Sequence, residues 1–472
     1  MVSPPFNVLR EVQKFFCLVN LSGELRVADR RKIAIALSAN EVIEVFFHKK
    51  ADGEVLIKRY LETLLVDSDV RKIVVDFWVD PNTHVYDAID FSPLQVPSTT
   101  LNYWRGHTIE PVVGCWKDLS GFLLDVICDA DEKVYEYLIC YLAHMLQRPE
   151  EKPGIMLVML GSQGCGKGTF FTMIRKIWAQ TALQINDIEQ VLGRFNAILE
   201  RNYAILMDEA LFSGDKKASE KLKNIITESR IPIEQKYQPS RTINSCHRFF
   251  AASNNEHFAK VDKDDRRFLF LRVSNKYQNN FAYFEVLHNE IASGKQLAAM
   301  VHDLLAMDIG TFNVRVRPKT QEHLSQKLQS LEGFDRYWHE VLQSGEFCSY
   351  NWPQCIIRWE TPIFLSTQSL LEDYKKFNRN AERYSPVQTN NISKALQKSC
   401  PSAIATRTTI SNRQERGYDL PSIQTARREF EVYIGSKLLW AVDQEQPKKT
   451  YYIEEQIQVM NESYGIESKI CD

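Results

Sequence analysis

The chain has 472 residues, which is enough for about two to four domains with large hydrophobic cores. Its 58 basic and 60 acidic residues leave a net charge of −2, so a uniformly basic coat for nucleic acid is excluded and only local basic patches could bind it. The ten cysteines include no CxxC pair, which excludes a zinc ribbon and argues against a disulfide framework. The chain opens without a signal-peptide pattern and holds no apolar run of membrane-spanning length, so we expect a cytoplasmic protein with no membrane partner.

The first 150 residues predict a mixed, mostly helical region. Short apolar runs at 42–47 and 72–77 are typical of strands, whereas 59–65 and 119–147 show the spacing of amphipathic helices. A polar stretch at 148–154 follows, so we expect a domain boundary near its start and a region 1–150 that folds apart from the rest.

Five apolar runs alternate with helical segments between residues 151 and 310. Alternation of this kind predicts a parallel sheet inside a three-layer α/β domain. The runs expected to form its strands are Ile155–Leu160, Ala182–Ile185, Tyr203–Met207, Phe249–Ala252 and Phe268–Val273.

The first of these strands leads into the most informative stretch of the chain, the loop GSQGCGKGT, which is followed by a helical pattern. In this context bare backbone N–H groups cradle phosphates, the helix N-terminus adds positive potential, and the lysine reaches the β- and γ-phosphates. The sequence therefore predicts a site for a nucleoside triphosphate. Its residues are Gly161, Gly164, Gly166, Lys167, Gly168 and Thr169.

One position departs from the usual pattern of such loops. A serine or threonine normally follows the lysine and holds Mg²⁺ through its hydroxyl. Gly168 stands there and Thr169 comes one residue later, so the metal must be held by carboxylates and water or by a shifted Thr169. The GKGT pattern also resembles the loop of adenylate kinases, which leaves a small-molecule kinase as an alternative; the roughly 160 residues before the loop weigh against it.

Two later strands end in polar residues suited to phosphate chemistry. Asp208 and Glu209 follow the third run, a Walker B pattern in which the aspartate holds Mg²⁺ and the glutamate polarises the attacking water. Asn254 follows the fourth run, where an amide could orient that water in the role called sensor 1.

Two arginines stand at the start of the last strand. Arg266 and Arg267 could reach the phosphates of an adjacent subunit and neutralise transition-state charge. The alternative is that they only pair with Asp264 and Asp265 beside them.

Taken together, these segments resemble the superfamily 3 helicases, a compact branch of the AAA+ ATPases, and most of all their phage and plasmid primase–helicase type. The resemblance covers about residues 90–440 and is strongest over 154–275. It implies a parallel sheet of order 5-1-4-3-2, ATP and Mg²⁺ as cofactors, and a homo-oligomeric ring, expected to be a hexamer, with ATP sites between subunits. Residues 1–150 would then form a collar that assembles the ring. The segments that carry the resemblance are GSQGCGKGTF (161–170), LGRFNAIL (192–199), ILMDEA (205–210), IEQKYQPSRTINSCHR (233–248), AASNN (251–255) and DDRRF (264–268).

The resemblance also implies a hairpin that projects into the channel of the ring. Segment 233–241 fits this hairpin, so Lys236 would contact the phosphate backbone of DNA and Tyr237 would stack on a base or brace the loop. A solvated surface turn is the alternative. The segment 192–199 offers Arg194 and Asn196, for which helix capping and surface pairing explain the sequence equally well.

The last third of the chain predicts a helical connector over 311–362, with a helix at 319–344, and a winged-helix domain with a tail over 363–472. Residues 389–399 are the candidate recognition helix and 403–419 the basic hairpin of the wing. A protein-docking module is the alternative. The residues expected to contact DNA are Lys394, Lys398, Arg407, Arg413 and Arg416.

The combined expectation is an ATP-driven, ring-forming DNA helicase in the replication of a phage or other mobile element, in a bacterial or phage-infected host cell. Its partners would be single-stranded and forked or origin DNA, with a primase or polymerase supplied in trans. Two alternatives are an ATP-gated initiator that binds an origin, and an AAA+ ATPase that remodels protein or nucleoprotein targets, for instance in phage defence, without strand separation. Asp76 and Asp80 invite a primase metal site, but the histidine motif of archaeo-eukaryotic-type primases is not evident.

Overall fold

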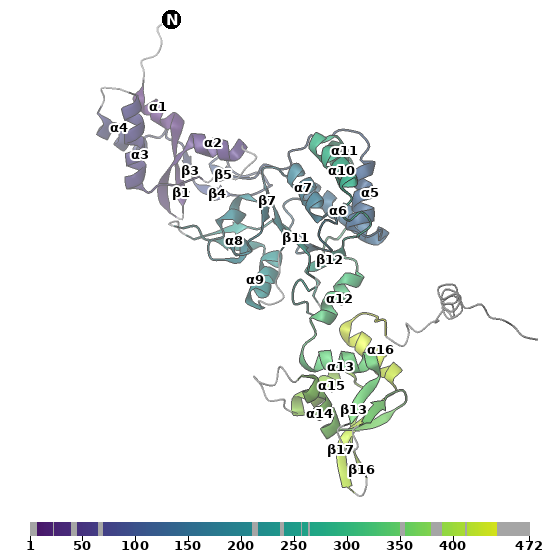
Figure 1. Ribbon diagram of the computed structural model, residues 1–472. Coiled ribbons are helices and arrows are strands. Elements are labelled where there is room, and N and C mark those ends of the chain that lie inside the picture. The colour runs from purple at the N-terminus through teal and green to yellow at the C-terminus, as the bar shows by residue number, and fades with distance from the viewer. Residues whose placement is uncertain are drawn as a thin grey trace, which may run out of the picture. The chain divides into compact units, whose positions relative to one another are not determined.

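The structure, a computed structural model, describes residues 7–21, 23–38, 45–64, 69–209, 216–236, 240–255, 257–262, 265–349, 355–378, 389–410 and 413–440. The chain divides into two compact units, Met1–Ser330 and Leu331–Asp472 (Figure 1). The boundaries that the sequence predicts near residues 150 and 362 therefore do not separate compact units. Side chains from both sides of residue 150 share one hydrophobic cluster, which joins the first 150 residues to the central sheet and its helices.

The first unit begins with a small sheet and its own helices. These elements are α1 (Val8–Phe15), β1 (Phe16–Leu21), β2 (Glu24–Asp29), α2 (Arg30–Ser38), α3 (Lys50–Thr63), α4 (Val70–Val79) and β3 (Val85–Tyr86). The sheet has the order β2-β1-β3. Val12, Ile57, Val74 and Phe77 from the helices pack with Phe16 of β1, so helices and sheet share one apolar cluster.

One of the two strands predicted in this region is wrong, and the other lies partly outside the described residues. Residues 72–77 lie inside α4, where the Asp69 carboxylate accepts hydrogen bonds from the backbone N–H groups of Arg71 and Lys72. The apolar residues of α4 recur at helical spacing, so packing on one face overrides the strand preference of its β-branched residues. Of the run 42–47, the first three residues lie outside the described part of the chain and the last three form no strand.

The stretch 119–147, which the sequence predicts to form one or two helices, is divided in two. Left-handed backbone at Asp129 (φ 49°) and Ala130 (φ 60°) breaks it, and Asp131 then caps the next helix. Two short strands that pair in parallel precede this helical stretch. These elements are β4 (Ala88–Asp90), β5 (Thr100–Asn102), α5 (Lys117–Phe122), a π-helical turn (Leu123–Ile127) and α6 (Glu132–Gln147).

A five-stranded parallel sheet forms the centre of the first unit. Its strands are β6 (Met156–Leu160), β7 (Ala182–Ile185), β8 (Ala204–Met207), β11 (Arg248–Ser253) and β12 (Phe268–Arg272). Their order is β12-β6-β11-β8-β7, which reads 5-1-4-3-2 when the strands are numbered along the chain. The predicted parallel sheet is confirmed, and its five strand runs agree with the structure to within about one residue at either end.

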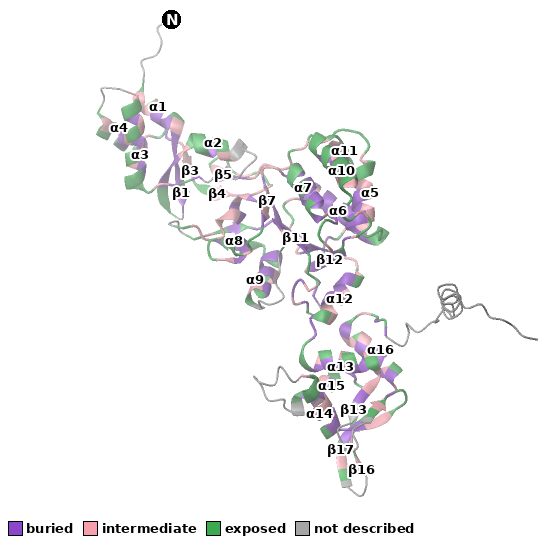
Figure 2. Cartoon of the chain, in the orientation of Figure 1, coloured by how far each residue is buried: buried purple, intermediate pink, exposed green. Residues whose placement is uncertain are grey.

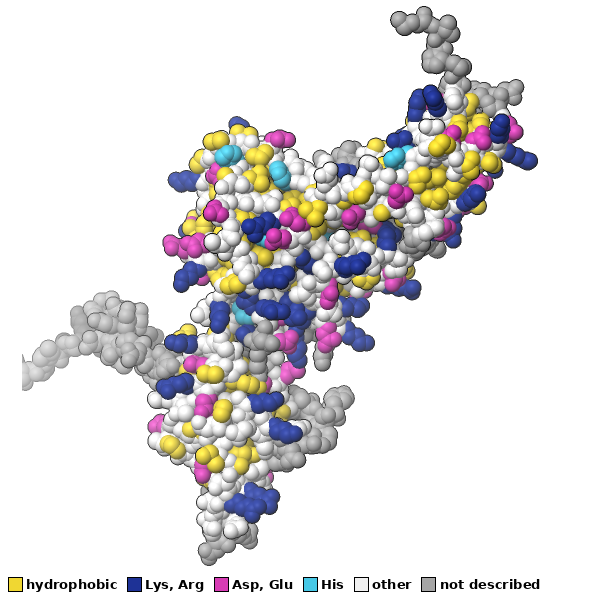
Figure 3. Space-filling model, turned by 180° about the vertical axis from the view of Figure 1, so that it is seen from behind, with side chains coloured by type: hydrophobic (Ala, Val, Ile, Leu, Met, Phe, Trp, Pro, Cys, Tyr) yellow, Lys and Arg dark blue, Asp and Glu magenta, His cyan; other side chains and the backbone are white. Residues whose placement is uncertain are grey.

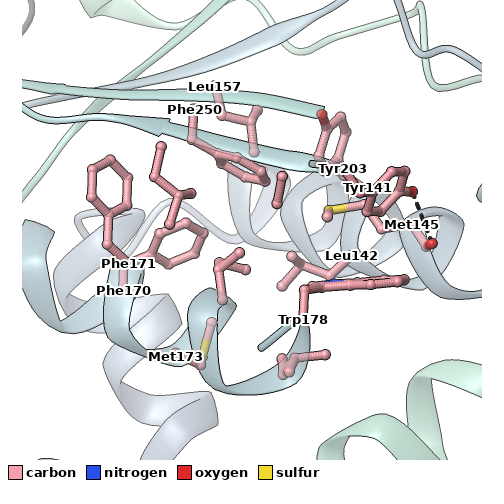
Figure 4. Close-up of a cluster of buried hydrophobic side chains, with 14 of the residues drawn as sticks. Tyr141, Leu142, Met145, Leu157, Phe170, Phe171, Met173, Trp178, Tyr203 and Phe250 are labelled. Atoms are coloured by element: carbon pink, nitrogen blue, oxygen red, sulfur yellow. Dashed lines mark hydrogen bonds between the residues drawn. The ribbon is translucent and has the colours of Figure 1, made fainter. Parts of the chain in front are cut away.

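Helices cover both faces of this sheet, as a parallel sheet requires. Alternate residues of β6 point into two clusters: Leu157 packs on one face and Val158 on the other. Figure 2 shows strand β11 of this sheet as buried. In the first cluster the Tyr203 hydroxyl also donates a hydrogen bond to the Met145 carbonyl at 3.0 Å (Figure 4). The first face is covered by α6, α7 (Lys167–Ile177), α10 (Phe281–Ser293) and α11 (Lys295–Ala306). The second face is covered by α8 (Glu189–Leu192), a 3₁₀ turn (Ala197–Arg201), α9 (Lys216–Thr227) and the hairpin of β9 (Arg230–Ile233) and β10 (Arg241–Asn244). Helix α12 (Gln321–Gln329) packs on β12.

The second unit contains an antiparallel sheet of order β15-β17-β16. Its elements are α13 (Gly333–Ser344), β13 (Glu346–Ser349), β14 (Cys355–Arg358), β15 (Ile363–Ser366), α14 (Thr367–Phe377), α15 (Thr389–Ser399), β16 (Ile404–Ile410), β17 (Arg413–Leu420) and α16 (Ile423–Ile434). The single helix predicted over 319–344 is two helices, α12 and α13, with left-handed Gly333 (φ 54°) at the start of the second. The predicted connector is not wholly helical, because β13 and β14 pair as a hairpin. None of the described helices is both long and apolar enough to cross a bilayer.

A half-buried lysine links the segment 148–154 to the base of the β9–β10 hairpin. Lys152 Nζ donates to the Ile225 carbonyl at 2.7 Å, near the end of α9, and to the Ser245 hydroxyl directly after β10. The Ser245 hydroxyl also lies 2.9 Å from Nδ1 of His247. Burial lowers the pKa of Lys152 from 10.5 to about 7.

We predict that this lysine makes the stability of the wild-type protein rise with pH between about 7 and 10. The unfolded chain binds the Lys152 proton throughout that range and the folded chain releases it near pH 7, so the slope reaches at most about 1.4 kcal/mol per pH unit and vanishes below pH 7. Lys152→Met should lose this contribution. Urea unfolding of both proteins from pH 6 to 9.5 measures it, and parallel curves for the two proteins would contradict the prediction.

Candidate functional site

The loop between β6 and α7 is held in a shape that only glycine adopts easily. Gly164 (φ 75°) and Gly166 (φ 115°) are left-handed. A Cβ at Gly164 would lie 2.5 Å from Oδ1 of Asn279, and one at Gly166 would lie 3.1 Å from the rings of Phe122 and Phe284. No side chain caps α7 at Gly166, so the first N–H groups of the helix face the loop without a side-chain acceptor.

Two further glycines of the loop differ from each other. A Cβ at Gly161 would lie 3.1 Å from the carbonyl of Val273, so this position needs glycine for close packing against the end of β12. A Cβ at Gly168 would meet nothing within 4 Å, because this residue borders open space in front of the loop.

The Lys167 ammonium group donates hydrogen bonds to two carbonyls of the loop and to the residue after one strand. Its Nζ lies 2.6 Å from the Gly161 carbonyl, 2.8 Å from the Ser162 carbonyl and 2.8 Å from Oδ1 of Asn254. The structure thus brings together two residues that the sequence places at separate strand ends. Backbone carbonyls are weaker acceptors for an ammonium group than an anionic oxygen, so an anion could displace them.

A pocket of about 570 Å³ lies in front of this loop. Most of the predicted phosphate-site residues line it: Gly164, Gly166, Lys167, Gly168, Thr169, Asp208, Glu209 and Asn254. Others were missed because no motif marks them: Thr172, Arg175, Gln184, Asn279, Phe281, Phe284 and His288. Gln163 also lines the pocket and was missed although it stands inside the glycine loop. Residues from five separate segments of the chain therefore share one cavity at the carboxyl edge of the sheet, where α/β folds usually bind ligands.

The two carboxylates after β8 are held differently. Gln184 Nε2 donates to Oδ2 of Asp208 at 2.8 Å, and Arg175 donates to Oε1 of Gln184 at 3.1 Å, so the aspartate is fixed by a short relay. Glu209 is exposed and left-handed, with φ 54°. This backbone is uncommon for glutamate and costs free energy, which makes Glu209 a candidate for a functional role.

The Thr169 hydroxyl is engaged by a residue far away in the sequence. It lies 3.0 Å from Nε2 of His288 on α10. The expected alternative, in which a shifted Thr169 holds a metal ion, would require it to leave this histidine.

Arg266 and Arg267 do not line the pocket. The Arg267 carbonyl accepts a hydrogen bond from the N–H of Met156 at 2.8 Å, which puts it at the amino edge of the sheet. The glycine loop leaves β6 five residues later, about 16 Å away at 3.3 Å per residue. Arg267 also forms an ion pair with Asp265 at 3.6 Å, as the alternative interpretation predicts, whereas Arg266 is exposed. Within one chain neither arginine belongs to the pocket.

A second candidate surface lies at the end of the β9–β10 hairpin. The ring of Phe195, 47% exposed, has Lys236 Nζ at 5.4 Å from its centroid and the Arg194 guanidinium at 5.6 Å. Arg194 also pairs with Glu234 at 2.9 Å. Tyr237 lies outside the described residues. Phe195 was missed as a site residue although it stands inside the segment 192–199.

Asn196 fastens this segment to the hairpin. Its Nδ2 donates to the Pro232 carbonyl at 2.9 Å, and its Oδ1 accepts from the Glu234 N–H at 3.0 Å. Glu200 also makes a two-pronged ion pair with Arg241 of β10, at 2.5 Å for each contact. The segment and the hairpin are therefore one rigid element.

The second unit carries cations on α15 and on the β16–β17 hairpin. Lys394 and Lys398 are exposed and one helical turn apart. Arg407 and Arg416 are exposed and directly opposite each other in the antiparallel register. Arg413 begins β17, but its side chain lies outside the part of the chain that the structure describes. Lys and Arg side chains gather near the end of this hairpin in Figure 3.

Comparison with known proteins gives one family and one relative. Residues 159–267 match DUF5906, a family of unknown function, and this stretch runs from the end of β6 to the residue before β12. The chain is 25% identical over 205 residues to the DNA Primase-polymerase of Nitratiruptor phage NrS-1. This alignment covers 41% of the chain and 28% of the relative, so the chain spans little more than a quarter of that protein.

Solved structures of the NrS-1 C-terminal region have a similar mixed α/β fold. The apo structure matches with a TM-score of 0.59 at 14% identity, covering 89% of this chain and 100% of the other. Its A form matches with a TM-score of 0.58 at the same identity and coverage. At this identity the likeness is one of fold.

Proposed function

We propose that the chain is an ATP-dependent DNA helicase of the superfamily 3, AAA+ type, which acts as a ring, expected to be a hexamer, in the replication of a phage or another mobile element. The observation that carries the proposal is the shared pocket of Lys167, Asn254 and the Asp208–Glu209 pair. The strand order 5-1-4-3-2 supports the AAA+ assignment, because the resemblance in sequence implies the same order.

The loop fits a triphosphate. The uncapped N–H groups of α7 offer donors to phosphate oxygens. Lys167 would exchange its two loop carbonyls for β- and γ-phosphate oxygens and keep Asn254 beside it. The cavity volume also lies within the range of nucleotide-sized pockets.

The donor set fits Mg²⁺ through Asp208 more directly than through Thr169. The hydrogen bond from Gln184 orients the Asp208 carboxylate, as partners of metal-ligating carboxylates commonly do. Thr169 already has a partner in His288. When bound, the ion would neutralise charge on the β- and γ-phosphates. Glu209 would accept a proton from the attacking water, and Asn254 would orient that water toward the phosphate.

The comparisons support a role in phage replication. The relative that shares 25% identity is named a DNA Primase-polymerase of a phage, and the likeness in fold is to its C-terminal region. The two cationic surfaces fit DNA as the partner. An exposed aromatic ring flanked by cations, as at Phe195, suits single-stranded DNA, where bases stack and phosphates need counter-charge.

The winged-helix assignment rests on the order of elements in the second unit. Helices α14 and α15 precede the β16–β17 hairpin, and β15 pairs with β17 to complete the sheet. In such a domain α15 would be the recognition helix and the hairpin the wing.

The cations of α15 and the β16–β17 hairpin favour an alternative function, an ATP-gated initiator that binds an origin and does not separate strands itself.

Strand displacement tests the proposal against this alternative. Forked DNA with 3′ or 5′ tails is incubated with the protein and ATP, with a primase or polymerase absent so that unwinding alone is measured. We expect displacement that needs ATP and is lost in Lys236→Ala, whose ATPase should persist. ATP-dependent binding of duplex DNA with no displacement on any fork would favour the initiator.

We predict that Lys167→Ala and Glu209→Gln each lower ATP hydrolysis, by roughly 10²–10³-fold, which is typical when one charge-stabilising group is removed. Lys167→Ala should also weaken ATP binding, because it removes the cation at the phosphates. Glu209→Gln should bind ATP normally. Turnover assays and fluorescent-ATP titrations measure both, and near-normal turnover in Glu209→Gln would exclude Glu209 as the base.

We predict that Arg266 and Arg267 act on the nucleotide of a neighbouring subunit, because about 16 Å separates them from the pocket of their own chain. Mixing Arg266→Ala/Arg267→Ala protein with Glu209→Gln protein should then restore part of the ATPase at mixed interfaces. Lys167→Ala mixed with Glu209→Gln is the control and should stay inactive, since both lesions lie in the same pocket. If the arginine mixture stays inactive although mixed rings form, the assignment is wrong.

We predict that the wing captures DNA through Arg407 and Arg416. Arg407→Ala/Arg416→Ala should weaken DNA binding and reduce the slope of log affinity against log salt by about 0.7–0.9 for each phosphate that is no longer bound. Basal ATPase should not change. Arg358→Ala removes a cation of the same unit that is 82% exposed and serves as the control. Equal slopes for wild type and double variant would indicate a protein-docking module.

A further inference from the structure

An aromatic face of α10 forms one wall of the pocket and has no role in the proposed hydrolysis. Phe281, Phe284 and His288 line the cavity, and their spacing puts them on one side of the helix. Phe281 is 84% exposed, so its ring packs against little of the protein. An aromatic ring that is exposed at the rim of a polar pocket is free to stack on a flat ligand that enters the pocket.

The turn that precedes Phe281 is hydrogen-bonded to the glycine loop. Gln278 Nε2 donates to the Gln163 carbonyl at 3.0 Å, and the Asn279 N–H donates to the Gly164 carbonyl at 3.3 Å. Asn279 is left-handed, with φ 59°, and Asn280 caps α10 by accepting from the N–H of Tyr283 at 3.1 Å. The backbone at Phe281 therefore keeps a fixed place relative to the loop.

The other two side chains of this wall already have partners. The Phe284 ring packs against Gly166, where a Cβ would lie 3.1 Å from it, and His288 bonds to the Thr169 hydroxyl. Phe281, in contrast, packs against little of the protein. Another part of the pocket lining is polar, because Arg175, Gln184 and Asp208 form one hydrogen-bonded relay there.

We propose that Phe281 stacks on the base of the bound nucleoside triphosphate, and that the site takes purine nucleotides in preference to pyrimidines. The inference rests on the proposed nucleotide binding. Lys167, Asn254 and Phe281 line the same cavity. A nucleotide whose γ-phosphate binds at Lys167 and Asn254 would extend through this cavity and place its base against α10. The stacking free energy grows with the area of the base, so a purine binds more tightly than a pyrimidine. Stacking alone does not distinguish adenine from guanine.

The test compares a ligand that has a base with one that has none. Dissociation constants are measured with Mg²⁺ for ATP, GTP, CTP and inorganic tripolyphosphate, using the full chain with Glu209→Gln to prevent turnover. Phe281→Ala should weaken ATP and GTP binding about tenfold or more. It should change tripolyphosphate binding by less than about twofold, and Phe281→Trp should keep purine affinity. Val286→Ala is the matched control, because Val286 is an exposed residue of α10 that does not line the pocket.

Each outcome decides the inference separately from the proposed function. Unchanged ATP affinity in Phe281→Ala overturns stacking while ATP binding itself stands. Equal weakening of ATP and tripolyphosphate overturns it too, because the effect then lies at the phosphates or in the fold. A loss of ATP affinity seen only at protein concentrations where copies associate makes Phe281 a subunit contact instead. If the unsubstituted pocket binds neither ATP nor tripolyphosphate, nucleotide binding fails and stacking fails with it.

Discussion

The pairing of β6 between β11 and β12 is the constraint on which the pocket depends. Leu160, the last residue of β6, lies opposite Ser253 in β11, and the N–H of Gly161 donates to the Ser253 carbonyl at 3.3 Å. The glycine loop and Asn254 therefore leave the sheet at the same level, which puts Lys167 within 2.8 Å of the amide. β8 continues this arrangement on the other side of β11, so its two acids also lie at the carboxyl edge. A shift of one residue in any of these pairings would turn the strand-end side chains to the opposite face.

The sequence predicts the parts of the site that depend on local pattern. Apolar runs of strand length give the sheet, and the acids and amide that follow them give the strand ends, because parallel strands all end at one edge. It does not predict Gln184, Phe281 or His288, which approach the pocket only through packing and belong to no motif. It also misassigns α4, whose β-branched residues are typical of strands until the helix packs against the N-terminal sheet.

Several local rules are broken on the surfaces that we propose bind ligands. Glu209 and Asn279, which both line the pocket, adopt left-handed backbone. Arg407 and Arg416 face each other across a hairpin, an arrangement that repels unless an anion lies between or above them. The exposed ring of Phe281 buries little apolar surface and so gains little hydrophobic stabilisation. Each of these features costs stability, and natural proteins keep such costs where a bound ligand offsets them.

The separation of Arg267 from the pocket has a consequence for how catalysis and assembly are linked. A single chain presents the pocket at the carboxyl edge of its sheet and an arginine pair at the amino edge, about 16 Å apart. If both act in hydrolysis, each site takes its groups from two copies of the chain, and an isolated copy holds only half of it. The rate of ATP hydrolysis per chain should then rise with protein concentration until association is complete. A rate per chain that stays constant from far below to far above the association range would show that the arginines serve only their ion pair with Asp265.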